Sequence, residues 1–402
     1  MNNILIIGAG SIGVLMGASL VKAGFKVTFA GRPQSIYTKQ IQNRGLTIVF
    51  PTNTRFFISP LQSQVRFIDT ETYLAEKFDL IIVALKSNDL APVASYIKFH
   101  TTKDTLIVHA QNGIPYWWFN DESYLKSLNP TVLQKLSSRR HLDSVDPQGK
   151  ILSSLGNFTL VGCVVKAPCH KTSEGYIQVK KPPKLILGLT QSQANSKQEA
   201  RVKQLGEIFS EHGISATYTS DIRTAVCHKL AINATTNVLS ALTGKVIADL
   251  TSNSYSNKLI KKIIWEINQI FQVYGIKAEN LPTESQIYSY IQEPGSQSHL
   301  PSLAQDFSQH RAGEISLITA PVEMAKIANL AVPTLASLGE LLQLGQTYTL
   351  KVPHGKSHIL TFGHTFGFCK LTQDIFQSRF LNKIQILNVL SHLIQVNVSA
   401  LS

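Results

Sequence analysis

The sequence GAGSIG at positions 8–13 constrains the fold most, because it directly follows an apolar, β-branched run at residues 3–7. In a strand–turn–helix unit, the first glycine allows a tight turn, the second lets the backbone approach a pyrophosphate, and the third lets helix and strand pack closely. The helix expected over residues 14–23 would direct its N-terminus at the phosphates. A glycine-rich turn without a ligand is the alternative. The residues expected to contact a dinucleotide are Gly8, Gly10, Ser11, Ile12 and Gly13.

Further short apolar runs follow and alternate with helical patterns. The strand of the first unit has no polar face, which implies burial in a parallel sheet. The alternation of apolar runs with helices indicates a doubly wound α/β domain of the Rossmann type over residues 1–220. From residue 221 the pattern is helical, which predicts an all-α domain over residues 221–346. The expected strands cover residues 3–7, 26–30, 45–50, 78–85, 105–109, 159–166 and 185–189.

Two segments do not fit this alternation. Residues 115–154 carry two tryptophans, an SSRR stretch and a DPQG stretch, and we interpret them as an insertion on the edge of the sheet. Residues 347–402 mix His, Thr, Gly and Phe before an apolar helical pattern at 380–396. They predict a C-terminal extension of unknown role.

The composition limits the classes of partner. With 38 Lys and Arg against 25 Asp and Glu, the net charge of +13 suits anionic ligands. The cations are dispersed, without a basic block interleaved with aromatic residues, so we do not expect nucleic-acid binding. No apolar stretch is long enough for a membrane span, and the apolar start lacks the basic region of a signal peptide. The four cysteines have no metal-ligand spacing, so we expect reduced thiols in a cytoplasmic protein without a metal site.

The end of the second expected strand indicates which dinucleotide binds. An acidic residue there would bind the ribose 2′-hydroxyl of NAD, whereas an arginine pairs with the 2′-phosphate of NADP. Arg32 follows this strand with no acid nearby in the sequence, which favours NADP, although a solvated loop arginine is the alternative. Lys86 ends the 78–85 run and is either a second phosphate contact or an exposed strand-end lysine. Asn112, in the Asn-Gly pair after the 105–109 run, either contacts the nicotinamide or substrate or only forms a turn.

The segment HKLAINATTN at residues 228–237 places three polar residues four positions apart. In a helix, Lys229, Asn233 and Asn237 therefore share one face. Buried amide and ammonium groups need partners, which a cleft for a polar anion would provide. A lysine whose pKa is lowered by burial can also donate a proton when hydride reaches a ketone. A polar surface stripe is the alternative interpretation.

A second polar segment covers residues 299–315. Ser302 and Gln305 have the spacing of a capping box, so Ser302 alone predicts a helix N-cap. Glu314 follows a glycine at an expected loop or helix start, where a surface carboxylate is common.

Together these motifs resemble the ketopantoate reductase family over about residues 1–345, apart from the insertion. That family has an N-terminal GxGxxG, a lysine after the fourth strand, a QNG loop, the helical motif KxxxNxxxN, and SxxxD with a glutamate twelve residues after the serine. The matching positions are Gly8 to Gly13, Lys86, Gln111-Asn112-Gly113, Lys229/Asn233/Asn237, and Ser302/Asp306 with Glu314.

The resemblance implies reduction of 2-dehydropantoate (ketopantoate) to pantoate with NADPH, a step toward pantothenate and coenzyme A. It implies that Lys229 is the general acid and that Glu314 holds the substrate hydroxyl and orders the lysine. It further implies that Asn112 lies between cofactor and substrate. The residues implied to bind substrate are Asn233, Asn237 and Ser302, and those implied to bind the 2′-phosphate are Arg32 and Lys86.

Some features depart from the family pattern. A further asparagine is often found about ten residues after the second helical one, where this chain has Ile247. The segment from PYWWF onward resembles a longer paralogous branch. A reductase of another 2-keto acid therefore remains an alternative, and a non-catalytic NADP-binding sensor is a further one. A monomer or a homodimer is expected.

Overall fold

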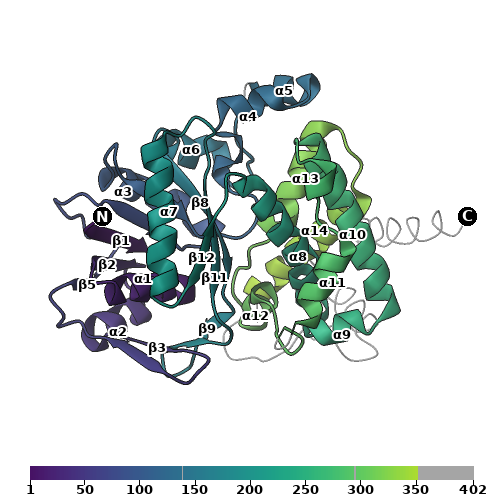
Figure 1. Ribbon diagram of the computed structural model, residues 1–402. Coiled ribbons are helices and arrows are strands. Elements are labelled where there is room, and N and C mark those ends of the chain that lie inside the picture. Colours follow the sequence, from purple (N-terminus) through teal and green to yellow (C-terminus); the bar gives the residue numbers. More distant parts are fainter. Residues whose placement is uncertain (138, 294–295, 352–402) are drawn as a thin grey trace, which may run out of the picture. The chain divides into compact units, whose positions relative to one another are not determined.

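The computed structural model describes residues 1–137, 139–293 and 296–351 (Figure 1). The chain divides into two compact units. Of the described residues, unit 1 contains those in Met1–Lys229 and Tyr274–Asn280, and unit 2 contains those in Leu230–Val273 and from Leu281 to Lys351. Of the expected extension, residues 347–351 continue a helix of unit 2, whereas the 380–396 segment lies outside the described residues.

The described part of unit 1 contains an eight-stranded sheet in the order β12-β11-β8-β7-β6-β1-β2-β5. All neighbouring strands are parallel except β8 and β11, which are antiparallel. The predicted α/β fold class is therefore confirmed. The strands are β1 (Asn3–Ile7), β2 (Lys26–Gly31), β5 (Val65–Asp69), β6 (Leu80–Val83), β7 (Leu106–His109), β8 (Thr159–Lys166), β11 (Lys184–Leu189) and β12 (Ser215–Tyr218).

A second, four-stranded sheet has the order β4-β3-β10-β9. The strand expected at residues 45–50 forms as β3 (Leu46–Val49), but it pairs in this smaller sheet rather than in the main one. The other strands of this sheet are short, which explains why the sequence pattern did not predict them. They are β4 (Arg55–Ile58), β9 (Cys169–Lys171) and β10 (Ile177–Val179).

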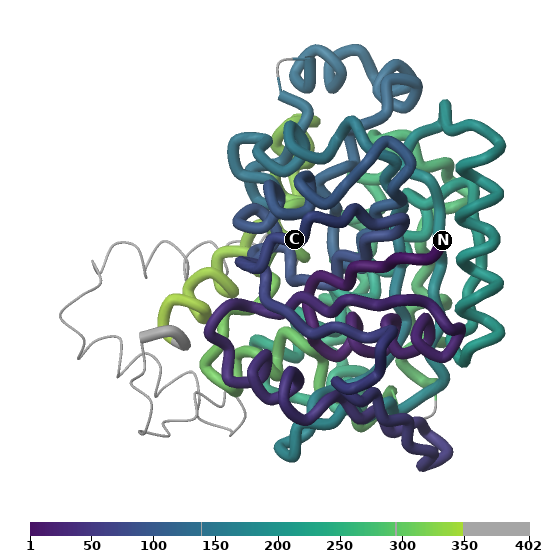
Figure 2. The backbone as a smooth tube through the Cα atoms, turned by 90° about the vertical axis from the view of Figure 1, so that its left-hand side faces the viewer, coloured from purple at the N-terminus to yellow at the C-terminus, as the bar shows by residue number. Residues whose placement is uncertain are grey.

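Helices pack on the main sheet where glycines permit close approach. In α1 (Ser11–Lys22), a Cβ on Gly17 would overlap the ring of Phe29 in β2, so only glycine lets the helix lie so close to the strand. The helix α1 lies beside the long α7 (Ser196–Glu211), as the views from two sides agree (Figure 2). Other helices of unit 1 are α2 (Ile36–Arg44), α3 (Ala94–Phe99) and the short η1 (Ser87–Asp89) and η2 (Ala91–Val93).

We had expected the segment at 115–154 to lie on the edge of the sheet, and this expectation is wrong. It connects β7 with β8, which are neighbours inside the sheet order. Its apolar start is buried, and a Cβ on Gly162 of β8 would overlap the ring of Trp117. This aromatic packing places the start of the segment against β8, inside the sheet order. Its helices are η3 (Tyr116–Phe119), α4 (Glu122–Ser127), α5 (Pro130–Ser137), η4 (Pro147–Gly149) and α6 (Lys150–Leu155).

The described part of unit 2 is helical, as the sequence predicts. Glu266 of α10 is buried, and its two carboxylate oxygens accept hydrogen bonds from the backbone N–H groups of Thr334 (2.9 Å) and Leu335 (2.8 Å). These N–H groups lie in the first turn of α14, where a helix has no internal acceptors. The helices are α9 (Ile247–Thr251), α10 (Ser254–Val273), α11 (Glu284–Gln292), α12 (Ser302–Ser308), α13 (Ser316–Ala328) and α14 (Pro333–Lys351). The helix α8 (Ile222–Thr243) begins in unit 1 and continues into unit 2.

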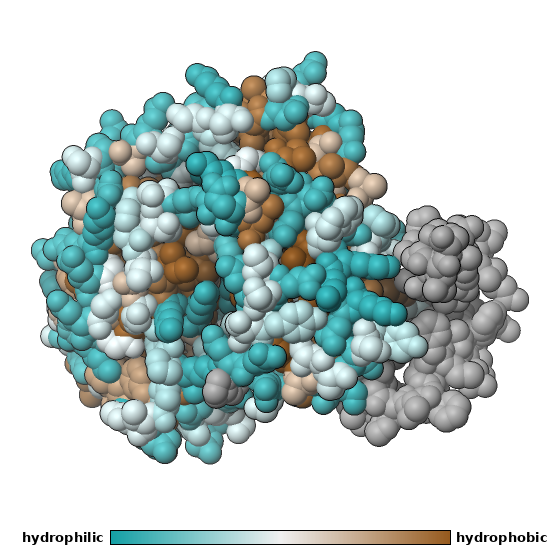
Figure 3. Space-filling view, turned by 45° about the vertical axis from the view of Figure 1, so that its right-hand side comes forward, coloured by the Kyte–Doolittle hydropathy of each residue, from teal (hydrophilic) through white to brown (hydrophobic). Residues whose placement is uncertain are grey.

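On the face seen in Figure 3, hydrophilic residues cover most of the described surface, and hydrophobic residues form separate patches among them. Within the described residues, none of the helices combines the length and apolarity that a bilayer crossing requires.

Candidate active site

The glycine turn after β1 has the geometry that a dinucleotide needs. Gly8 has φ +99°, a conformation that favours glycine, and a Cβ on Gly13 would overlap the carbonyl oxygen of Gly8. A Cβ on Gly10 would meet nothing within 4 Å. Gly10 is the N-cap of α1, so the open space lies at the helix N-terminus, where backbone N–H groups attract phosphates. Ser11 and Ile12 are the first two residues of α1, and both are partly buried.

The other expected cofactor contacts converge on the same edge of the sheet. β1 lies between β2 and β6, and the chain order reverses at β1, which is the usual ligand position in such sheets. Backbone hydrogen bonds continue past the strand ends, from Ala84 N to Ile7 O (2.8 Å) and from Ala110 N to Val83 O (2.9 Å). The residues after β2, β6 and β7, which include Arg32, Lys86 and Asn112, therefore follow parallel strands at their carboxyl ends.

Arg32 has a partner that the sequence did not indicate. Its guanidinium forms an ion pair with the carboxylate of Asp89, the last residue of η1. Lys86 is the N-cap of η1, and its carbonyl accepts a hydrogen bond from Asp89 N (3.0 Å). Lys86 lies three residues beyond the end of β6, which is the sixth strand along the chain because β4 and β5 were not predicted.

Lys229, Asn233 and Asn237 all lie on α8, as predicted. Asn233 and Asn237 are only 4% and 7% exposed, so their face of the helix is not a solvated surface stripe. Thr236 Oγ1 donates to Asn237 Oδ1 at 3.2 Å, whereas Asn233 Nδ2 has no hydrogen-bond partner among the described residues. A buried amide donor without a partner is costly, which indicates a place where a polar ligand can bind.

Lys229 is partly buried and electrostatically suited to proton transfer. Burial lowers the pKa of Lys229 from its ordinary value of 10.5 to about 8, and the positive charge of Lys166 contributes to this shift. Lys166 is the exposed last residue of β8. A lysine with a pKa near neutrality can both hold a proton and release it.

In unit 2, the segments of Ser302 and Glu314 lie against each other. A Cβ on Gly313 would overlap Leu303 of α12, so the loop before α13 packs on the helix that Ser302 begins. Glu314 is buried in this loop, whereas the Ser302 side chain is exposed. The expectation that Ser302 is an N-cap is wrong, because Pro301 is the N-cap and Gln305 Nε2 donates to Leu300 O.

The sequence did not single out one buried polar residue on α8. Ser240 is fully buried, and its hydroxyl has no hydrogen-bond partner among the described residues. It follows Asn233 by seven residues and therefore lies on the same helical face. This spacing could have revealed it, but a single serine in an apolar helix carries little information on its own.

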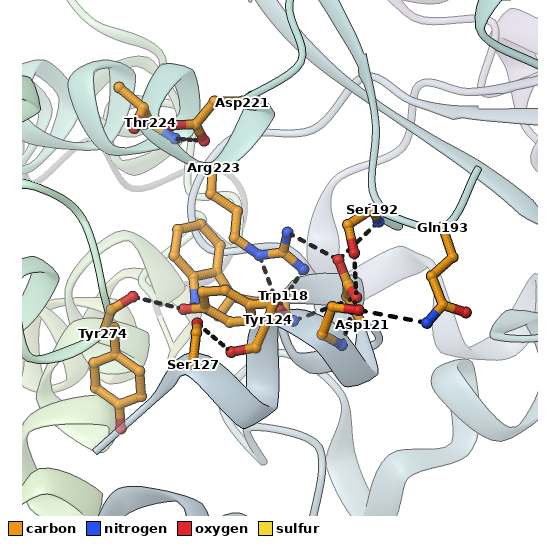
Figure 4. Close-up of polar contacts among 11 residues, drawn as sticks. Trp118, Asp121, Tyr124, Ser127, Ser192, Gln193, Asp221, Arg223, Thr224 and Tyr274 are labelled. Carbon is orange, nitrogen blue, oxygen red and sulfur yellow. Dashed lines mark hydrogen bonds and ion pairs between the residues drawn. The ribbon is translucent and has the colours of Figure 1, made fainter. Parts of the chain in front are cut away.

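The beginning of α8 is held by a buried polar network that involves the 115–154 segment (Figure 4). Arg223 donates from Nε and Nη2 to the carbonyl oxygen of Trp118, at 3.1 and 3.0 Å. Its guanidinium lies 4.0 Å from the ring centroid of Tyr124 and pairs with Asp121 at 3.9 Å. The hydroxyl of Tyr124 donates to Tyr274 O at 2.9 Å. The segment thus fixes the helix that carries Lys229.

Comparison with known proteins gives consistent matches in both halves of the chain. A family model described as Ketopantoate reductase PanE/ApbA matches residues 4–117, and its C-terminal counterpart matches residues 221–346. The chain belongs to the ketopantoate reductase family. A 2-dehydropantoate 2-reductase from Mesorhizobium japonicum is 26% identical over 342 residues, which cover 85% of this chain and 96% of that relative.

Solved structures show the same fold at low identity. A 2-dehydropantoate 2-reductase from Methylococcus capsulatus has a TM-score of 0.67 at 22% identity, with 88% of this chain and 100% of that chain covered. D-mandelate dehydrogenase, solved with NADH and anilino(oxo)acetate, has a TM-score of 0.67 at 20% identity, with 87% and 99% covered. The relatives of this family that match the chain are named as oxidoreductases, the 2-dehydropantoate 2-reductases.

Proposed function

We propose that this chain reduces ketopantoate to pantoate with NADPH. The observation that carries the proposal is on α8, where the unpartnered amide of Asn233 lies one helical turn from Lys229, whose pKa is about 8. This combination suits a carboxylate-bearing ketone, which needs hydrogen-bond donors and a proton source. The family membership and the order of the sequence motifs support the same reaction.

The residues at the carboxyl edge of the sheet fit a dinucleotide. The open space at Gly10 would admit the pyrophosphate, and Arg32 with Lys86 would hold the 2′-phosphate. Asn112, after β7, would lie on the nicotinamide side. The cofactor supplies the hydride, and the protein provides placement and charge stabilisation.

The substrate would be bound by side chains from α8 and from the α12–α13 region. Lys229 would hold a proton at Nζ and donate it to the carbonyl oxygen as negative charge develops there. Asn233 and Asn237 would donate hydrogen bonds to the polar groups of the substrate. We assign Ser302 to substrate binding, and Glu314 to the substrate hydroxyl and to ordering of the lysine.

The test is NADPH oxidation at 340 nm by the purified protein with ketopantoate and a panel of other 2-keto acids. Rapid turnover of ketopantoate, well above that of the other acids, is the expected result. Turnover of none of the acids, with NADPH still bound, would contradict catalysis and favour an NADP-binding sensor.

One observation favours a second candidate, a reductase of another 2-keto acid. Ile247 occupies the position where the family often has an asparagine, and it is 2% exposed at the start of α9. A buried isoleucine cannot donate the hydrogen bond that an asparagine would supply. Turnover confined to a 2-keto acid other than ketopantoate would select this candidate.

Replacing Arg32 with glutamate is expected to weaken NADPH binding about tenfold or more, because the 2′-phosphate loses a cation and meets a second carboxylate. NADH binding should change much less, since NADH lacks this phosphate. Dissociation constants of both coenzymes, measured by fluorescence titration, check the prediction. Equal weakening of both would contradict the assignment of Arg32 to the 2′-phosphate.

The pH profile should report Lys229. If Lys229 is the general acid, kcat/KM falls as the pH rises through about 8, where its ammonium loses the proton. Lys166→Met removes a positive charge that lowers the pKa of Lys229, so the fall should move to higher pH. Lys26→Met is the control, because Lys26 is an exposed lysine at the opposite, amino end of β2. If the fall of kcat/KM occurs at the same pH in Lys166→Met as in the wild type, Lys229 is not the titrating group.

A further inference from the structure

We propose that Asp89 is a coenzyme-selectivity residue that weakens NADPH binding and gives NADH an anchor at the same site. The inference rests on the proposed dinucleotide site and concerns the adenosine ribose end of it. Its basis is the ion pair between Arg32 and Asp89, which are 57 residues apart in the chain.

Local contacts fix the position of the Arg32 backbone. Arg32 directly follows β2, and its carbonyl oxygen accepts a hydrogen bond from Thr38 Oγ1 at 2.9 Å. A Cβ on Gly31 would overlap that same hydroxyl, so the turn between β2 and α2 is closely packed around Thr38. The Arg32 backbone is therefore fixed at the carboxyl end of β2, where the adenosine ribose lies in this fold.

Asp89 approaches the carboxyl end of β2 from the segment that follows β6. It ends η1, the short helix after β6, and its backbone N–H donates to Lys86 O. The sheet order places β6 on one side of β1 and β2 on the other. The Arg32 and Asp89 side chains are 67% and 33% exposed, so both can contact a ligand from solvent.

The two side chains favour different coenzymes. A 2′-phosphate attracts the guanidinium, but the carboxylate beside it repels the phosphate and competes for the arginine. The ribose 2′-hydroxyl of NADH can instead donate a hydrogen bond to a carboxylate, as it does to the acidic residue of NAD-binding proteins. The sequence near β2 contains no such acid, yet the fold supplies one from η1.

The experiment compares coenzyme affinities of the full chain and of Asp89→Asn. This substitution keeps the side-chain shape and removes the charge. NADPH should bind about tenfold more tightly to the variant, because a repulsive charge near the phosphate is gone. NADH should bind no more tightly than to the wild type, so the ratio of the two dissociation constants shifts toward NADPH.

The matched control is Glu76→Gln. Glu76 also forms an exposed ion pair in unit 1, with Arg66, and it lies beside Asn3 at the amino end of β1. The same charge change there should leave the ratio of dissociation constants at the wild-type value. A ratio that moves equally in both variants would overturn the inference, because the effect would then be one of net charge.

The remaining outcomes separate the inference from the proposed function. If the wild-type chain binds NADPH and Asp89→Asn leaves both affinities unchanged, the role of Asp89 is overturned and the dinucleotide site stands. If the wild-type chain binds neither coenzyme, the proposed function and this inference fail together. 2′-Phospho-AMP and AMP contain only the adenosine end of the two coenzymes. The ratio of their dissociation constants should therefore shift in Asp89→Asn in the same direction as the ratio for NADPH and NADH.

Discussion

Lys229→Ala should lower kcat by about 10²- to 10⁴-fold, the range that positioned general acids contribute. The affinity for NADPH should stay near the wild-type value, because Lys229 lies on α8 whereas the proposed dinucleotide contacts lie on the turns after β1, β2, β6 and β7. Steady-state rates with saturating NADPH, together with a fluorescence titration of NADPH, measure the two quantities separately.

Lys229→Arg distinguishes proton donation from positive charge alone. Arginine keeps the charge, but the very high pKa of its guanidinium prevents it from releasing a proton. If Lys229 acts as the acid, the arginine variant should be nearly as slow as the alanine variant. A rate near that of the wild type in Lys229→Arg would assign the residue to electrostatic stabilisation only, and a normal rate in Lys229→Ala would remove it from the chemistry.

The sequence predicts the parts of the site that depend on local spacing. The glycines at 8, 10 and 13 stand at fixed intervals after an apolar strand, and the structure shows a steric reason for Gly8 and Gly13, whereas a Cβ on Gly10 would meet nothing within 4 Å. The stripe of Lys229, Asn233 and Asn237 is likewise local, since one helix carries all three residues. The fold class followed from the alternation of apolar runs with helical patterns.

Features that depend on contacts between distant parts of the chain could not be predicted from the sequence. Nothing near Arg32 in the sequence indicates Asp89, because the two meet only when β2 and the segment after β6 reach the same edge of the sheet. Similarly, β3 joins β10 in a second sheet, and no local pattern encodes that partner. The 115–154 segment was placed on the sheet edge because a pattern without regular strands says nothing about where its aromatic residues pack.

Arg223→Met is expected to lower the free energy of unfolding by about 3 kcal/mol, the scale for removing one member of a buried, hydrogen-bonded charge pair. Arg223 is 9% exposed, and its loss leaves the carbonyl oxygen of Trp118 without its two guanidinium donors. Asp121 would lose its buried cation and keep only its hydrogen bonds to the backbone and to Ser192.

Urea unfolding followed by tryptophan fluorescence is a direct measurement of this loss. Trp117 and Trp118 are buried within the 115–154 segment, whereas Trp265 is 61% exposed, so the signal comes mainly from the region around Arg223. Arg140→Met is the matched control in the same segment. Its ion pair with Glu122 is exposed, so its removal should cost only about 0–1 kcal/mol.

The difference between these two variants decides what the 115–154 segment does. A large loss in Arg223→Met and a small one in Arg140→Met would mean that the segment holds the beginning of α8 through buried contacts. Lys229 lies six residues further along that helix, so kcat should fall in Arg223→Met under conditions where the variant is still folded. Arg223→Lys keeps the charge but not the two hydrogen bonds that converge on the carbonyl oxygen of Trp118, and partial recovery of both stability and kcat is expected. Equal stability losses in Arg223→Met and Arg140→Met would instead show that the network does not fix the helix.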